Sequence, residues 1–163
     1  MDRELLVRIP GIDAFERRLL ARTIVRESVA ARIDPLLVLA VIEVESSFDP
    51  EALSERGAMG LMQLRAPTLR RELERAGLEP EDANDPVANV QAGVRYLRRL
   101  LDAFGRDDVA LMAYNAGPNR ILGYLREGEI PGRFGVYPRR VKAELRRLRG
   151  TPVAAMADAR KFP

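Results

Sequence analysis

The sequence predicts a mainly α-helical protein with one compact domain. Apolar residues recur at helical spacing, and no run alternates apolar and polar residues as a half-buried strand would. Acidic cap residues followed by proline mark helix starts at Asp34-Pro35 and Asp85-Pro86, and Gly77 and Gly105 mark helix ends. At 163 residues, of which 47% are apolar, the chain is long enough for one hydrophobic core.

The first two predicted helices are each opened by an aspartate. Asp13 caps a helix that runs to about Ala31, with Glu16 in the capping-box position three residues later. Asp34 caps the second helix, and Pro35 occupies the first helical position, where its missing N–H is not needed. Residues 36–45 of this helix are apolar on nearly every side, which predicts a buried central helix.

The rest of the chain divides by the same signals. Residues 46–64 have glycines and a proline but no sustained period, so we expect a loop there that could contain a short hairpin. Five further helices are expected at about 67–76, 86–104, 108–116, 118–126 and 138–148. We divide the chain into an N-terminal helical extension packed on the domain (1–24), the main domain (25–150) and a loose C-terminal tail (151–163).

The composition excludes several kinds of active site. Without cysteine the chain has no disulfide and no thiolate metal site. Without histidine it has no Ser–His triad, no histidine-based zinc site and no histidine general base, so carboxylates are the natural proton carriers. No apolar stretch reaches the roughly 18 residues that span a bilayer, and the N-terminus lacks the features of a signal peptide.

Two carboxylates interrupt the apolar central helix. Glu43 and Glu45 are about 200° apart around the helix axis, so they cannot share one site. Glu45 lies on the ridge of Val41 and Ile42, near the helix C-terminus. Burial and the negative end of the helix dipole both raise its pKa, and a carboxyl protonated near neutral pH suits a general acid. A simple ion pair with one of the many arginines is the structural alternative.

Two more segments carry candidate polar groups. In Gly57–Gln63, two glycines three residues apart allow a tight turn or a close approach to a ligand, and the Gln63 amide can both donate and accept hydrogen bonds. In Ala113–Pro118, Gly117-Pro118 separates two helices and presents Tyr114 and Asn115 at their junction. Each segment alone has a purely structural interpretation, as a turn or as buried hydrogen-bonded residues.

Taken together, these blocks resemble the soluble lytic transglycosylase catalytic domain of the lysozyme-like superfamily. The residues that carry the resemblance, which covers about residues 25–148, are Glu45-Ser46-Ser47-Phe48, Gly60-Leu61-Met62-Gln63, the Asn89-x-x-x-Gly93-x-x-Tyr96-Leu97 helix and Ala113-Tyr114-Asn115-Ala116-Gly117-Pro118. Four blocks in the family's order and at its separations are a specific signal. The resemblance implies a lysozyme-like helical domain with a substrate groove.

The resemblance also implies roles for individual residues. Glu45 matches the catalytic glutamate of the family, and Tyr137 matches a late tyrosine that contacts the catalytic site. The residues that the resemblance implies to bind substrate are Ser46, Ser54, Met62, Gln63, Tyr114, Asn115 and Tyr137. No metal or cofactor is implied.

The chain departs from the family pattern in two places. Family members usually have Met-Pro shortly after the glutamine, where this chain has Arg65-Ala66-Pro67, so a guanidinium changes the groove floor. A Glu-Thr pair usually precedes the late tyrosine, but here the stretch is Arg133–Val136 and is one residue short. A groove-side carboxylate is therefore missing, which leaves the catalytic acid in place but bears on affinity and substrate register.

The implied activity is the non-hydrolytic cleavage of the β-1,4 bond between N-acetylmuramic acid (MurNAc) and N-acetylglucosamine (GlcNAc) in peptidoglycan, leaving 1,6-anhydro-MurNAc ends. Three alternatives remain: a lysozyme-type muramidase that recruits Asp49, Glu51 or Glu55 as a second carboxylate, a non-catalytic glycan-binding module on the same fold, and a nucleic-acid-binding helical protein. The last fits poorly with a net charge of only +3 and interleaved acidic residues. We expect a monomer acting on glycan strands, without nucleic acid or a membrane-spanning segment, in the periplasm or cell envelope where that substrate lies.

Overall fold

The computed structural model describes residues 5, 8–9, 12–78 and 85–150. Within these ranges the chain is helical, which confirms the predicted all-α class. The helices are α2 (Ala14–Ala30), α3 (Pro35–Ser46), α4 (Ala66–Arg75), α5 (Pro86–Phe104), α6 (Asp107–Ala116), α7 (Pro118–Glu127), the short 3-10 helix η1 (Gly132–Gly135) and α8 (Val136–Gly150). The predicted tail at 151–163 and part of the predicted extension at 1–24 lie outside the described residues.

A small antiparallel hairpin lies between α3 and α4, in the segment where we expected a loop that could contain one. Strand β1 (Ala58–Met59) pairs with β2 (Leu64–Arg65), with Ala58 opposite Arg65 and Met59 opposite Leu64. The hairpin leads directly into α4, because Arg65 is both the last residue of β2 and the N-cap of α4.

The predicted caps form hydrogen bonds. Asp34 accepts from the Leu36 amide at 2.9 Å and opens α3, and Asp85 accepts from the first-turn amides of α5. The predicted boundary between residues 24 and 25 falls inside α2, which continues through it to Ala30. Helix α8 starts at Val136, two residues before the predicted start at Pro138, because a proline in the first turn needs no amide partner.

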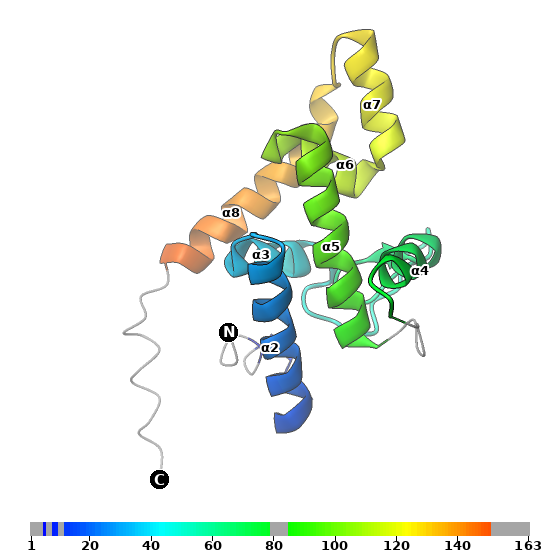
Figure 1. Ribbon diagram of the computed structural model, residues 1–163. Coiled ribbons are helices and arrows are strands. Elements are labelled where there is room, and N and C mark those ends of the chain that lie inside the picture. The colour runs from blue at the N-terminus through cyan, green and yellow to red at the C-terminus, as the bar shows by residue number, and fades with distance from the viewer. Residues whose placement is uncertain (1–4, 6–7, 10–11, 79–84, 151–163) are drawn as a thin grey trace.

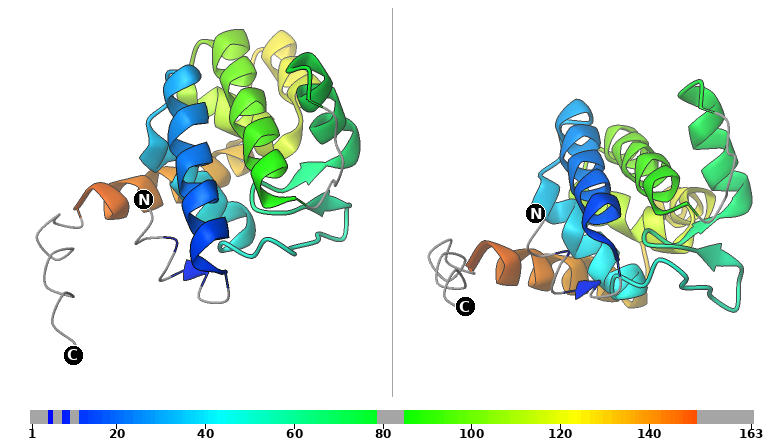
Figure 2. Two further views of the ribbon diagram at one scale, coloured as in Figure 1. Left: turned by 60° about the horizontal axis from the view of Figure 1, so that its bottom comes forward. Right: turned by 90° about the horizontal axis from the view of Figure 1, so that it is seen from below.

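Helix α3 is the centre of the domain, as its apolar sequence predicts. Its residues Val38–Ile42 are fully buried, and it packs chiefly on α8 and also on α2. Helix α5 packs on α2, α4 and α6. Figure 2 shows α2 and α5 side by side, with α8 running across beneath them. In Figure 1, α6 and α7 lie at one end of the domain and the hairpin and α4 lie to the side of α5.

None of the helices in these ranges is both long enough and apolar enough to cross a membrane.

Candidate active site

Glu45 is the next-to-last residue of α3, at the point where the helix leaves the core. The backbone turns sharply there, because Ser47 and Phe48 both adopt positive φ angles, of 53° and 64°. Glu45 forms no ion pair with any described residue. Instead it accepts a hydrogen bond from the phenol of Tyr137 in α8, with Oη and Oε1 2.6 Å apart. The packing of α3 on α8 therefore brings these two side chains together.

Burial raises the pKa of Glu45 from 4.5 to about 7. The hydrogen bond from Tyr137 and the charge of Arg140 act in the opposite direction, because both favour the carboxylate, but burial outweighs them. The same burial, together with the charge of Glu45, raises the pKa of Tyr137 and of Tyr114, so both phenols stay protonated near neutral pH. Glu45 is thus a carboxyl that can give up and take back a proton near neutral pH.

A cavity of about 440 Å³ opens beside Glu45, a volume within the range of ordinary ligand sites. Glu45 is the only carboxylate among the described residues that line it. The other lining residues are Ser54, Arg56, Ala58, Gln63, Leu64, Arg65, Thr68, Tyr96, Tyr114, Asn115, Ala116, Gly117 and Pro118. The hairpin and the start of α4 supply one side of the cavity, and the α6–α7 junction supplies another.

Five residues predicted from the sequence line this cavity together: Glu45, Ser54, Gln63, Tyr114 and Asn115. Gln63 donates from Nε2 to the carbonyl oxygens of Ala52 and Gly60, at 2.9 and 3.0 Å. Its Oε1 receives no hydrogen bond from the described part of the chain and is left for a ligand. Asn115 is exposed at the end of α6. For these residues, contact with a substrate stays a prediction.

The hydroxyl groups of Ser54 and Tyr114 already have protein partners. Ser54 Oγ accepts from the Ala58 amide at 2.9 Å, which closes the turn before β1. Tyr114 Oη donates to the Met62 carbonyl oxygen at 2.8 Å and so ties α6 to the hairpin loop. The Tyr114 hydrogen is therefore used inside the protein, and only its ring and hydroxyl oxygen can face a ligand.

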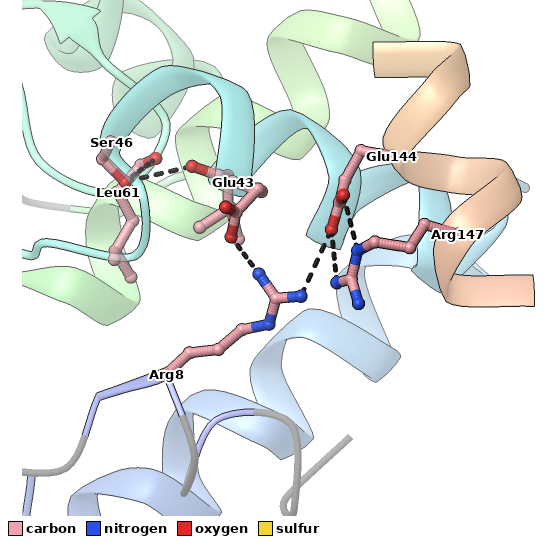
Figure 3. Close-up of polar contacts among 7 residues, drawn as sticks. Arg8, Glu43, Ser46, Leu61, Glu144 and Arg147 are labelled. Atoms are coloured by element: carbon pink, nitrogen blue, oxygen red, sulfur yellow. Dashed lines mark hydrogen bonds and ion pairs between the residues drawn. The ribbon is translucent and has the colours of Figure 1, made fainter. Parts of the chain in front are cut away.

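Three other predicted substrate-binding residues do not line the cavity. Met62 is fully buried, so its side chain fills the core. Ser46 Oγ lies 3.1 Å from the Ile42 carbonyl oxygen and 2.9 Å from that of Leu61, and it joins the end of α3 to the hairpin loop, as Figure 3 shows. Tyr137 contacts Glu45 rather than the cavity. The sequence pattern could not separate the internal contacts of Ser46 and Met62 from substrate contact, whereas the resemblance did imply that Tyr137 contacts the catalytic site. Contact of these three residues with a substrate stays a prediction.

The four sequence blocks meet because the hairpin loop packs closely on α5 and is hydrogen-bonded to it. Asn89 is fully buried, accepts from the Met62 amide at 2.8 Å and donates to the Met59 carbonyl oxygen at 2.9 Å. Gly60 has a φ of 72°, and a Cβ there would lie 2.6 Å from Asn89 Nδ2. One turn along α5, a Cβ on Gly93 would lie 2.7 Å from the Met62 Cβ. The two glycines are therefore required by this close approach.

Sequence reasoning missed the role of several cavity residues. Tyr96 lies in a block that the resemblance includes, and its ring stands 5.4 Å from that of Tyr114, which in turn stacks at 6.5 Å on Tyr137. The spacing of Asn89, Gly93 and Tyr96 places all three on one face of α5, and this was the available signal. Arg56 and Thr68 carried no signal in the sequence, because only the fold of the hairpin brings them to the cavity.

Glu43 points away from Glu45, as the helical geometry predicts, and forms an ion pair with Arg8. The Arg8 guanidinium bridges Glu43 of α3 and Glu144 of α8, at 3.2 Å from the latter, while Arg147 also binds Glu144 (Figure 3). The Arg8 guanidinium carbon also lies 4.9 Å from the centre of the Phe48 ring. Arg8 therefore joins the two helices that carry Glu45 and Tyr137.

The three acidic residues that could supply a second catalytic carboxylate do not line the cavity. Asp49, Glu51 and Glu55 are all exposed in the segment between α3 and β1. Asp49 accepts from the Glu51 amide at 2.9 Å in a local turn.

Residues 22–131 match the family model of the transglycosylase SLT domain. This chain belongs to the transglycosylase SLT domain family. The matched residues include α3, the hairpin, α5 and the α6–α7 junction, that is, Glu45 and every cavity-lining residue. Tyr137, which contacts Glu45, and Arg8 and Glu144, which join α3 to α8, lie outside the match.

Relatives with curated names agree with this membership. The SLT domain is 37% identical over 111 residues to the transglycosylase of Enterobacteria phage PRD1, covering 68% of this chain and 40% of that protein. It is 32% identical over 101 residues to the soluble lytic murein transglycosylase of Escherichia coli, covering 59% of this chain and 15% of that protein. The chain spans less than half the length of these relatives.

A solved structure shares the fold. The 70-kDa soluble lytic transglycosylase of Escherichia coli superposes with a TM-score of 0.67 at 25% identity, covering 85% of this chain and 26% of that one. The helical architecture described above is thus shared with a soluble lytic transglycosylase, in agreement with the family resemblance of the sequence.

Proposed function

We propose that this chain is a peptidoglycan lytic transglycosylase that cleaves the MurNAc–GlcNAc bond with Glu45 as its only acid and base. The observation that carries the proposal is the buried Glu45 carboxyl, with its pKa raised to about 7, in a cavity lined by sugar-compatible amides and aromatic rings. The names of the relatives support murein as the substrate. Action at the cell envelope follows from that substrate.

In the first step, protonated Glu45 donates its proton to the glycosidic oxygen. The bond from this oxygen to C1 of MurNAc breaks, and GlcNAc leaves with a free 4-hydroxyl group. The carbonyl oxygen of the MurNAc N-acetyl group bonds to C1 and takes up the positive charge as an oxazolinium ion. Gln63 and Asn115 orient the sugar, since holding the reacting groups in place supplies a large part of the rate.

In the second step, the Glu45 carboxylate takes the proton of the MurNAc C6 hydroxyl. The C6 oxygen bonds to C1, the bond from the N-acetyl oxygen to C1 breaks, and a 1,6-anhydro ring results. Glu45 ends the cycle protonated, as it began. Water takes no part, so one carboxylate is enough.

The muramidase alternative requires a second carboxylate beside the scissile bond. The exposed positions of Asp49, Glu51 and Glu55, away from the lining of the cavity, favour the one-carboxylate reaction.

Mass analysis of the fragments released from purified sacculi tests the proposal. We expect wild-type protein to release 1,6-anhydro products, Glu45→Gln to release none, and the matched control Glu55→Gln to behave as wild type. Reducing ends would identify a muramidase, and loss of activity in Glu55→Gln would identify its second carboxylate. Release of no fragments by wild type would contradict the enzymatic function and leave the glycan-binding module. Equal release by wild type and Glu45→Gln would contradict the role of Glu45 as acid and base.

A further inference from the structure

We propose that Arg56, Arg65, Thr68 and the N-terminus of α4 form a carboxylate-binding subsite in the cavity of Glu45. The subsite takes the acidic groups of the glycan substrate and sets its register. This inference rests on the proposed function and adds to it the class of substrate group that the hairpin side of the cavity recognises.

The hairpin brings the two arginines to one side of the cavity. Arg56 lies in the turn before β1, which is closed by the hydrogen bond from the Gly57 amide to the Ser54 carbonyl oxygen at 2.9 Å. Arg65 ends β2 and is paired in register with Ala58, two residues after Arg56. Both arginines line the same cavity as Glu45.

Neither guanidinium has an ion-pair or hydrogen-bond partner within the described ranges. Elsewhere the arginines often pair with carboxylates, as Arg95 does with Glu27 at 3.1 Å. Glu45 does not neutralise them, since its charged neighbour is Arg140. This side of the cavity therefore presents two uncompensated positive charges.

Helix α4 adds to the same positive field. Its N-cap is Arg65, whose side chain forms no capping hydrogen bond, so the first-turn amides of Ala66 and Thr68 have no side-chain acceptor. The N-terminus of a helix favours an anion through these amides and through the helix dipole. Thr68 lies in that first turn and also lines the cavity, where its hydroxyl can donate to an oxygen anion.

Planar guanidinium groups pair most strongly with carboxylates, in two-pronged contacts that fix orientation. In peptidoglycan this chemistry has two sources: the lactyl carboxylate of MurNAc where no peptide is attached, and the carboxylates of the stem peptide where one is.

Binding measurements in the Glu45→Gln background, where no turnover interferes, test the subsite. Three probes are titrated: glycan fragments with stem peptides, the same fragments stripped of peptide by an amidase, and a GlcNAc tetramer without carboxylates. The Arg56→Met/Arg65→Met variant is compared with Arg70→Met/Arg71→Met, which removes the same charge from exposed positions of α4 outside the cavity. Thermal unfolding verifies that both variants fold.

We expect the Arg56→Met/Arg65→Met variant to bind at least one carboxylate-bearing probe about tenfold more weakly, and the GlcNAc tetramer unchanged. Loss confined to the peptide-bearing fragments assigns the subsite to the stem peptide, and loss with the stripped fragments assigns it to the lactyl group. Equal loss for all three probes, no loss, or the same loss in the Arg70→Met/Arg71→Met control overturns the subsite. Failure of the Glu45→Gln protein itself to bind any probe contradicts the proposed function instead.

Discussion

Tyr137 donates its phenolic hydrogen to the Glu45 carboxyl over 2.6 Å, from α8 to α3. This hydrogen bond favours the charged form of Glu45 and holds its pKa below the value that burial alone would give. Tyr137 lies outside residues 22–131, which match the family model, although the sequence resemblance implied its contact with the catalytic site.

Tyr137→Phe should therefore raise the pKa of Glu45 further. A hydrogen bond to a charged group contributes about 1.5 kcal/mol, which corresponds to about one pH unit. We expect the basic limb of the pH profile of kcat/KM to move to higher pH by about that amount. Tyr124→Phe, on α7 and outside the cavity of Glu45, removes a phenol hydroxyl of comparable kind that accepts from Arg133; it is the matched control and should leave the limb in place. A limb that moves to lower pH in Tyr137→Phe would contradict the assigned direction.

The burial of Glu45 makes the protein less stable at alkaline pH. The folded protein binds this proton more tightly than the unfolded chain, because the pKa is about 7 in the fold and 4.5 for an ordinary glutamate. The contribution of Glu45 to the free energy of unfolding is therefore fully present below about pH 4.5 and is lost as the pH rises through 7. Its removal as Glu45→Gln should therefore stabilise the fold above pH 7, by at most about 3 kcal/mol at 1.36 kcal/mol per pKa unit.

Thermal unfolding of wild type and Glu45→Gln from pH 4 to pH 9 measures this effect. We expect the variant to gain several degrees in Tm at pH 8 and nothing at pH 4. A gain that does not depend on pH would show that packing, rather than the buried charge, causes it.

Gly93→Ala should weaken the close packing of α5 on the hairpin loop. The new Cβ would overlap the Met62 side chain, and overpacking of this kind typically costs about 1–3 kcal/mol. Gly123→Ala, a helical glycine in α7 with open space around it, is the control and should be neutral or slightly stabilising. Chemical denaturation measures both variants. Equal stability of the two would mean that Met62 moves aside without cost.

Arg8 should stabilise the packing of α3 on α8, the two helices that carry Glu45 and Tyr137. The Arg8 side chain is 16% exposed and bridges Glu43 and Glu144, so Arg8→Met leaves two partly buried carboxylates without this partner. We expect a loss of about 1–3 kcal/mol in unfolding free energy, with a fall in kcat because Arg8 joins the helices of Glu45 and Tyr137.

A double-mutant cycle of Arg8→Met with Glu43→Gln isolates the direct pair, and a coupling near 1 kcal/mol is expected. The exposed pair of Arg98 and Asp102, 2.6 Å apart on α5, is the control and should couple by no more than about 0.5 kcal/mol. Equal coupling in the two cycles would show that Arg8 contributes no more than a surface ion pair.

The helices and their starts could be predicted from the sequence because they depend on neighbouring residues. Asp34 and Asp85 cap helices through amides two or three positions away, and α3 is buried because its own residues are apolar. The burial of Glu45, a carboxyl on an apolar helix, could be predicted for the same reason, while its catalytic role stays a prediction. These features are local, and a single sequence is sufficient to find them.

What could not be predicted depends on contacts across long separations. Ser46 and Met62 belong to the family blocks, but only the packed fold shows that they join the hairpin to α3 and α5 rather than line the cavity. Arg8 reaches Glu144 across 136 positions. The convergence of Arg56 and Thr68 likewise depends on how the hairpin folds.

Three of the four tyrosines, at positions 96, 114 and 137, form a contiguous column next to Glu45, and the chain has no tryptophan. Most of the protein's near-ultraviolet absorption and emission therefore originates within this one site. A saccharide entering the cavity, or a proton leaving Glu45, should change the intrinsic tyrosine fluorescence, so the unmodified protein carries its own optical probe of occupancy.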